Sequence, residues 1–163
     1  MGLELNIQDI VGDLARGNLF EVELPYLGEN FKFYCKAASL PASTVKSVKV
    51  GYQNRSINYA GDREFAAWKL TVYNDDQQSI RRLFLEWSEL LQTHGRTMVG
   101  ALPSEYKQTA FVTQFDRANN ETAKFKFTGI FPSSVGEISL TWGEGAEVET
   151  FDVDLEVDWF EPV

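Results

Sequence analysis

The feature of this sequence that most constrains its fold is an alternation of apolar and acidic residues near the C-terminus, over residues 148–159. Phe151, Val153, Leu155, Val157 and Trp159 alternate there with Asp152, Asp154, Glu156 and Asp158. Because successive side chains of a β-strand point to opposite faces, the pattern predicts a strand with one apolar and one carboxylate face. The apolar face has to pack against a core. The acids recur about every 7 Å and repel one another unless they face water, cations or basic side chains.

Two segments near the N-terminus predict a hairpin. Residues 18–24 place Phe20, Val22 and Leu24 on one face and Glu21 and Glu23 on the other. Residues 31–37 alternate in the same way, and residues 25–30 between them have the composition of a turn. We therefore expect these segments to pair as antiparallel neighbours.

Four more strands are predicted over residues 64–73, 106–117, 122–130 and 138–142, with residues 131–137 as a connection. In the strand at 122–130, the phenylalanines face the core while Lys124 and Lys126 face away. We expect these lysines to lie opposite the C-terminal carboxylates, which would offset part of their repulsion.

One helix is predicted over residues 80–91. Its apolar residues Ile80, Leu83, Phe84, Trp87, Leu90 and Leu91 recur at helical spacing. Asn74, Asp75 and Asp76 supply acceptors for the unpaired amides at its N-terminus. Residues 93–95 are expected to end it.

These elements predict a mainly β protein, an antiparallel β-sandwich or barrel with one packed α-helix. The 163 residues suffice for a single domain over residues 1–163, and an aromatic content of 13% favours strands. We expect two arms to extend from the body, over residues 1–17 and residues 44–62. The second arm has few large apolar residues and carries Lys46, Lys49 and Arg55, with Arg63 beside it.

No arrangement of residues indicates catalysis, so we do not expect an enzyme. The single histidine, His94, has neither a nucleophile nor a set of metal ligands near it, and helix capping explains Asp75 and Asp76. No glycine-rich phosphate loop occurs, and acids on one flat strand do not wrap a cation as a loop does. We therefore expect no cofactor and no metal.

Charge and hydropathy exclude further classes of protein. With 24 acidic and 15 basic residues the net charge is −9, so the chain lacks the basic surface through which proteins grip nucleic acid. A protein that handles DNA by repelling it remains compatible with this charge. We expect no signal peptide and no membrane span, which requires about 20 apolar residues. Cys35 is the one cysteine, which excludes an intrachain disulfide and favours a buried, inert thiol.

Short segments spread in order along most of the chain carry a family resemblance. They are Asn18-Leu19-Phe20, Tyr26-Leu27-Gly28, Cys35-Lys36-Ala37, Leu40-Pro41-Ala42, Val50-Gly51, Asn54-Arg55, Ile57-Asn58, Ala60-Gly61-Asp62-Arg63, Trp68, Asn74-Asp75, Glu105-Tyr106-Lys107, Val135-Gly136-Glu137, Trp142, Thr150-Phe151 and Asp158. With the matching total length, this colinear set resembles the tail tube proteins of contractile-tailed bacteriophages of the T-even type.

The resemblance implies a β-barrel-like protomer that forms hexameric rings, which stack into a tube inside a contractile sheath. The secreted hexamer protein of type VI systems shares this fold. The implied partners are other copies of the chain, the tail sheath protein, and the baseplate and tail terminator proteins. DNA would pass through the channel without sequence-specific binding, and no stable membrane insertion is implied. The expected location is the tail of the virion, after assembly in the host cytoplasm.

Two sets of residues are candidates for these roles. A channel wall rich in carboxylates would repel DNA phosphates, and the candidates for it are Glu21, Glu23, Asp152, Asp154, Glu156 and Asp158. The same faces could instead point outward toward the sheath. The candidates for contact between rings are Lys46, Lys49, Arg55 and Arg63.

Two alternatives stay open at this point. The first is a tube subunit of a type VI secretion system or a tailocin, which would assemble in the same way but carry protein cargo or none. The second, from another class, is a monomeric β-barrel that binds a ligand in an apolar cavity and does not self-associate.

Overall fold

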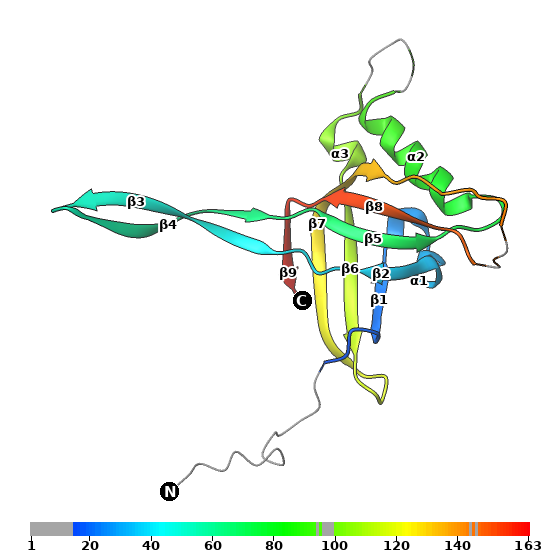
Figure 1. The fold of residues 1–163 in the computed structure, drawn as a ribbon, viewed down its shortest axis with the longest axis horizontal. Helices are drawn as coiled ribbons and strands as arrows, with labels where there is room; N and C mark the ends of the chain where they lie inside the picture. Colours follow the sequence, from blue (N-terminus) through cyan, green and yellow to red (C-terminus); the bar gives the residue numbers. More distant parts are fainter. Residues whose placement is uncertain (1–14, 94, 96–99, 144, 146) are drawn as a thin grey trace, which may run out of the picture.

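The structure, a computed structural model, describes residues 15–93, 95, 100–143, 145 and 147–163. The strands are β1 (Phe20–Glu23), β2 (Cys35–Ala38), β3 (Ser43–Tyr52), β4 (Arg55–Phe65), β5 (Trp68–Tyr73), β6 (Gln108–Phe115), β7 (Glu121–Val135), β8 (Thr150–Glu156) and β9 (Trp159–Pro162). The helices are η2 (Pro25–Leu27), α1 (Phe31–Tyr34), α2 (Ser79–Leu91) and α3 (Pro103–Tyr106). The predicted fold class, mainly antiparallel β with one packed helix, is confirmed (Figure 1).

The body is built from two groups of strands that share β7. The hydrogen-bonded order is β1-β6-β7-β8-β5-β2, with β9 also paired to β7. The first part of β7 pairs with β6 and β9, whereas residues 131–135 pair with β8. Figure 1 shows the two groups running across each other, as in a sandwich whose corner is formed by a strand that changes sheets.

The bend in β7 corrects two predictions. Residues 131–137 were predicted as a connection, but β7 continues to Val135 through Pro132, with an irregular register between Pro132 and Ser134. Lys124 and Lys126 do not lie opposite the β8 carboxylates, because the part of β7 that carries them pairs with β6 and β9. Lys126 lies opposite Glu161 instead.

The core lies between the two strand groups. Trp68 on β5 stacks on Phe127 of β7 with ring centroids 4.3 Å apart, and both side chains are fully buried. The alternation predicted near the C-terminus is confirmed over residues 151–157, where Phe151, Val153, Leu155 and Val157 are buried. Helix α2 adds Ile80, Phe84 and Trp87 to the same core.

Helix α2 forms as its periodicity predicts, but it is capped differently. Gln78 precedes it in the left-handed conformation, and Asp75 accepts hydrogen bonds from the Ser79 amide and hydroxyl, both at 2.6 Å. Asn74 is buried and donates to the Glu149 carboxylate at 3.0 Å. Asp75 alone of the predicted cluster therefore satisfies the start of the helix. The helix ends at Leu91, and His94 lies outside the described residues.

Two predicted strand arrangements are wrong. Residues 31–34 form a helical turn, and β1 pairs with β6 while β2 pairs with β5. The turn buries Phe31 against Phe84, with centroids 5.9 Å apart, and leaves Phe33 exposed, whereas a strand would have buried both. Residues 138–142 form no strand, because none of the strands that the structure describes pairs with them.

Most of the predicted N-terminal arm, residues 1–14, lies outside the described residues. Among the helices that the structure describes, none combines the length and apolar character needed to cross a bilayer.

Candidate functional site

The carboxylates of β8 occupy the outer face of the β2-β5-β8 sheet. Asp152 and Glu156 are exposed and Asp154 is half-buried, while the residues between them point into the core. Asp152 accepts a hydrogen bond from the Thr71 hydroxyl at 2.7 Å, and Asp154 lies opposite Lys69 on β5. Lys36 of β2 also lies beside this face, with its ammonium group over the Tyr73 ring of β5, so two lysines against three acids leave the face negative.

Glu21 and Glu23 lie on the other strand group, on a face that also carries lysines. They pair in register with Thr113 and Phe111 of β6, and the same two residues pair on their far side with Lys124 and Lys126. Glu21 also forms an ion pair with Lys32 at 3.5 Å. The structure therefore does not bring the two predicted groups of acids together.

Asp158 leaves the row of β8 acids. It lies between β8 and β9, and its carboxylate forms an ion pair with Lys107 at 2.7 Å. Gly129 has a φ of +68°, and its lack of a side chain leaves room for this carboxylate, because a Cβ at that position would collide with it. Among the described residues, Asp158 is thus the acid of the row that forms an ion pair within the chain.

Strands β3 and β4 form a hairpin that projects from the body (Figure 1). Gln53 and Asn54 both have positive φ, as a two-residue type I′ turn requires. At the base, Phe65 packs on Phe160 with centroids 5.1 Å apart. The hairpin occupies the segment for which the sequence predicts an arm.

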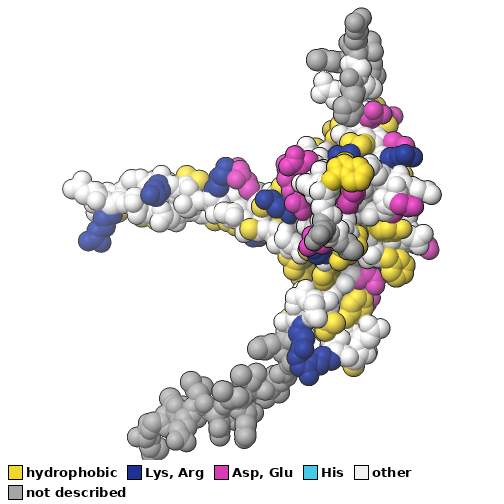
Figure 2. All heavy atoms as spheres, turned by 45° about the vertical axis from the view of Figure 1, so that its right-hand side comes forward, with side chains coloured by type: hydrophobic (Ala, Val, Ile, Leu, Met, Phe, Trp, Pro, Cys, Tyr) yellow, Lys and Arg dark blue, Asp and Glu magenta, His cyan; other side chains and the backbone are white. Residues whose placement is uncertain are grey.

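The four basic candidates on the hairpin differ in their surroundings. Lys46 forms an ion pair with Glu64, and Arg63 donates to the Ser43 hydroxyl at 2.8 Å. Lys49 and Arg55, nearer the tip, form no ion pair with any residue in the part of the chain that the structure describes. Figure 2 shows basic side chains along the hairpin, with acidic ones only near its base on the face drawn.

Sequence reasoning missed an apolar face on this hairpin. Val48, Val50 and Tyr52 alternate on β3, and Ile57 and Tyr59 lie opposite them on β4. All five side chains are exposed. The period-two pattern within residues 48–59 was the available signal, but it was hidden by the number of polar residues in the segment.

The residues that the structure describes form neither a metal site nor a reactive thiol. The described residues contain no group of three or more His, Cys, Asp or Glu side chains that could hold a metal ion. Burial raises the pKa of the Cys35 thiol to about 12. A thiol with such a pKa stays protonated at neutral pH and is a poor nucleophile.

A family model described as phage tail tube protein matches residues 9–160. The chain belongs to the phage tail tube protein family. It is 44% identical over 151 residues to tail tube protein gp19 of Enterobacteria phage T4, covering 92% of this chain and 93% of that protein. Tail tube protein gp19 of Enterobacteria phage T6 gives the same identity and coverage.

Solved structures of tail-like machines share the fold of this tail tube protein. A chain in the sheath/tube terminator of the extracellular contractile injection system PVC aligns with a TM-score of 0.73 at 11% identity, covering 94% of this chain and 99% of that one. A chain in the anti-feeding prophage baseplate aligns with a TM-score of 0.66, covering 94% and 97%. The chain is thus a structural protein of the phage tail tube, and the secretion-system and ligand-binding alternatives are not favoured.

Proposed function

We propose that this tail tube protein assembles into hexameric rings, which stack inside a contractile sheath and form the channel for DNA. The T4 and T6 relatives are named tail tube proteins, and one structural neighbour comes from a baseplate that is described as 6-fold symmetrised. Other neighbours come from sheath-tube and terminator assemblies. The proposed partners are accordingly further copies of the chain, the sheath, the baseplate and the tail terminator.

The observation that carries the channel assignment is the net negative charge of the outer face that β8 contributes to. Asp152, Asp154 and Glu156 share the outer face of one sheet with Lys69 on β5 and Lys36 on β2, so the acids outnumber the lysines. Six copies, each with a net charge of −9, would give a ring of about −54. A wall of this sign repels phosphates and lets DNA slide without binding. The β1 acids support this role less well, because Glu21 already forms an ion pair with Lys32.

Electron microscopy of the purified protein over a concentration series tests the assembly. Rings or hollow tubes with a central channel are the expected result. Particles that stay monomeric at every concentration, even after baseplate proteins are added as a template, would contradict the proposal and restore the ligand-binding alternative.

The channel assignment makes a separate prediction. Replacing Asp152, Asp154 and Glu156 by Lys should leave tube assembly intact but slow DNA ejection, because the wall would then attract phosphates. The control replaces Glu21 and Glu23 by Lys, which reverses charge on the other sheet. Ejection is measured by the release of labelled genomes from complemented virions. Unchanged ejection through normal tubes of the β8 variant would remove these acids from the channel.

A further inference from the structure

The outer half of the β3–β4 hairpin exposes a continuous apolar face. Val48 lies opposite Tyr59 and Val50 opposite Ile57, and these side chains are 43% to 57% exposed. The opposite face carries Ser47, Lys49, Ser56 and Asn58. A two-stranded hairpin is only marginally stable in water by itself, and contiguous exposed apolar surface marks an interaction site. The face is therefore suited to being covered by a partner.

A second exposed apolar surface lies on the segment between β7 and β8. Leu140 is 75% exposed and Trp142 is fully exposed. Together with Glu137, Glu147 and Val148, these residues line a hollow of about 910 Å³. This part of the chain, which we call the 137–149 loop, has no neighbouring strand among the described residues.

The two surfaces have opposite charge. Residues 43–61 contain three basic residues and no acid, whereas residues 137–149 contain four glutamates and no basic residue. Glu149 accepts a hydrogen bond from Asn74, while Glu137 and Glu147 are exposed. Apolar patches framed by opposite charges fit the usual composition of a protein interface, in which the charges set orientation and the apolar centre supplies affinity.

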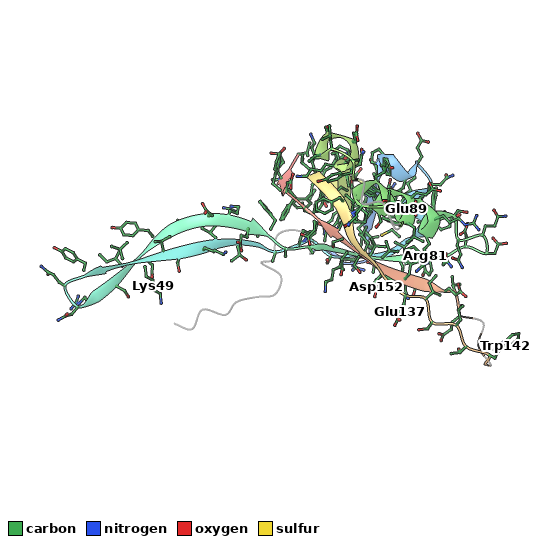
Figure 3. All side chains as sticks on the ribbon, turned by 90° about the horizontal axis from the view of Figure 1, so that it is seen from above. Lys49, Arg81, Glu89, Glu137, Trp142 and Asp152 are labelled. Atoms are coloured by element: carbon green, nitrogen blue, oxygen red, sulfur yellow. The ribbon has the colours of Figure 1, made fainter. Side chains whose placement is uncertain are left out.

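The two surfaces lie at opposite ends of the molecule. Figure 3 shows Lys49 on the hairpin at one end and Trp142 on the loop at the other, with the body between them. One copy therefore cannot join its own two surfaces. A contact between two different patches on identical chains leaves one patch of each free, so it propagates from copy to copy.

We propose that the apolar face of the β3–β4 hairpin docks on the 137–149 loop of a second copy of this chain. Val50 and Tyr59 pack against Leu140 and Trp142, while Arg55, which pairs with Tyr52 on the same face of the hairpin, lies against the glutamates of the loop. This inference rests on the proposed assembly, and it specifies the two surfaces that form one of the repeating contacts.

Crosslinking tests the contact directly. In a Cys35→Ala background, Val50→Cys and Leu140→Cys are combined in one chain, and assembled protein is treated with a short bismaleimide. A ladder of covalent multimers on a denaturing gel is expected, because each copy links to the next. The two single-cysteine variants are the matched controls and should give no ladder beyond a dimer.

Charge reversal tests the contact without crosslinking. Arg55→Glu and Glu147→Lys should each raise the protein concentration needed for assembly roughly tenfold, and the double variant should recover most of this loss. Arg82→Glu, on the exposed side of α2, is the control that changes charge elsewhere. Circular dichroism confirms that each variant is folded before assembly is scored.

The outcomes separate the two proposals. A wild-type chain that forms neither rings nor tubes would overturn the proposed function. Normal wild-type tubes, with no ladder from the double-cysteine variant and no recovery by the charge-swapped pair, would overturn only the docking of the hairpin on the 137–149 loop.

Discussion

At the scale of residues, two tryptophans show how position decides the contribution of a side chain. Trp68 is fully buried and stacks on Phe127 across the two strand groups, whereas Trp142 is fully exposed on the 137–149 loop. Removal of a buried aromatic ring leaves a cavity and forfeits its transfer free energy, while removal of an exposed ring does neither.

The first residue-scale prediction compares these two positions. Trp68→Ala should lower the free energy of unfolding by about 3–5 kcal/mol. Trp142→Ala, the matched control, should change it by less than about 0.5 kcal/mol. Urea unfolding is measured at concentrations below assembly, so that association does not contribute. Equal effects of the two substitutions would show that the core is not where the structure has it.

The second residue-scale prediction concerns Asp75. Its hydrogen bonds, first that from the Ser79 hydroxyl, hold the pKa of this carboxyl below its usual value. A lowered folded-state pKa contributes stability that is present above the usual aspartate pKa and is lost as the pH falls through the lowered one. Asp75→Ala should thus lower Tm by a few degrees at pH 7, with a difference that shrinks in acid.

Thermal melts of wild type and Asp75→Ala between pH 7 and pH 3 check the prediction for Asp75. Asp76→Ala is the control, because Asp76 is exposed and caps nothing in the described structure. A difference between wild type and Asp75→Ala that stays constant down to the lowest pH would show that the charge of Asp75 does not support α2.

At the scale of elements, β7 organises the body because it belongs to both strand groups. The strand turns at Gly129, whose positive φ suits glycine and whose missing Cβ leaves room for Asp158. The same turn sets Asp158 beside Lys107 and separates Lys126 from the β8 acids. The backbone conformation at Gly129 thus determines which charged side chains lie next to each other.

The element-scale prediction is that Gly129→Ala destabilises the protein by roughly 1–3 kcal/mol. The cause is the combination of a strained φ with displacement of the Asp158 carboxylate. Gly51→Ala on the hairpin is the control, since a Cβ there meets nothing within 4 Å. Unfolding in urea measures both variants, and a neutral Gly129→Ala would contradict the geometry of the β7 turn.

At the scale of the whole molecule, the chain consists of a body that contains the core and the β3–β4 hairpin that projects from it. The core lies entirely in the body, and the outer hairpin residues are exposed and pair with one another. The body should therefore keep its stability without them. Assembly, in contrast, should depend on them, because they supply the basic and apolar surface described above.

The whole-molecule prediction replaces residues 47–60 with an Asn-Gly turn. Tm measured on monomeric protein should change by no more than a few degrees, because no core residue is removed. Rings or tubes should no longer appear by electron microscopy. The control keeps the full hairpin and changes only Gln53-Asn54 to Asn-Gly. A shortened variant that forms normal tubes would show that assembly does not use the hairpin.

Local patterns in the sequence were enough for several elements and for the family. The period-two alternation over residues 151–157 predicts the burial of β8, and the helical period predicts α2. The sequence also shows which candidate residues are acidic, but it does not show which residues surround them in the fold. Glu23 and Asp154 look alike in the sequence, yet Glu23 shares its face with the β7 lysines, whereas Asp154 lies between Lys69 of β5 and Ser134 of β7.

The sequence by itself determined the class of structure, because the spacing of apolar residues dictates which local conformation can bury them. Only the tertiary structure decided the pairing of β1 with β6, the helical turn at Phe31 and the bend at Gly129. These features depend on how distant segments fill one shared core, as Phe31 does against Phe84. These features are stabilised by contacts between residues far apart in the chain, and a local sequence pattern does not show which distant residues come into contact.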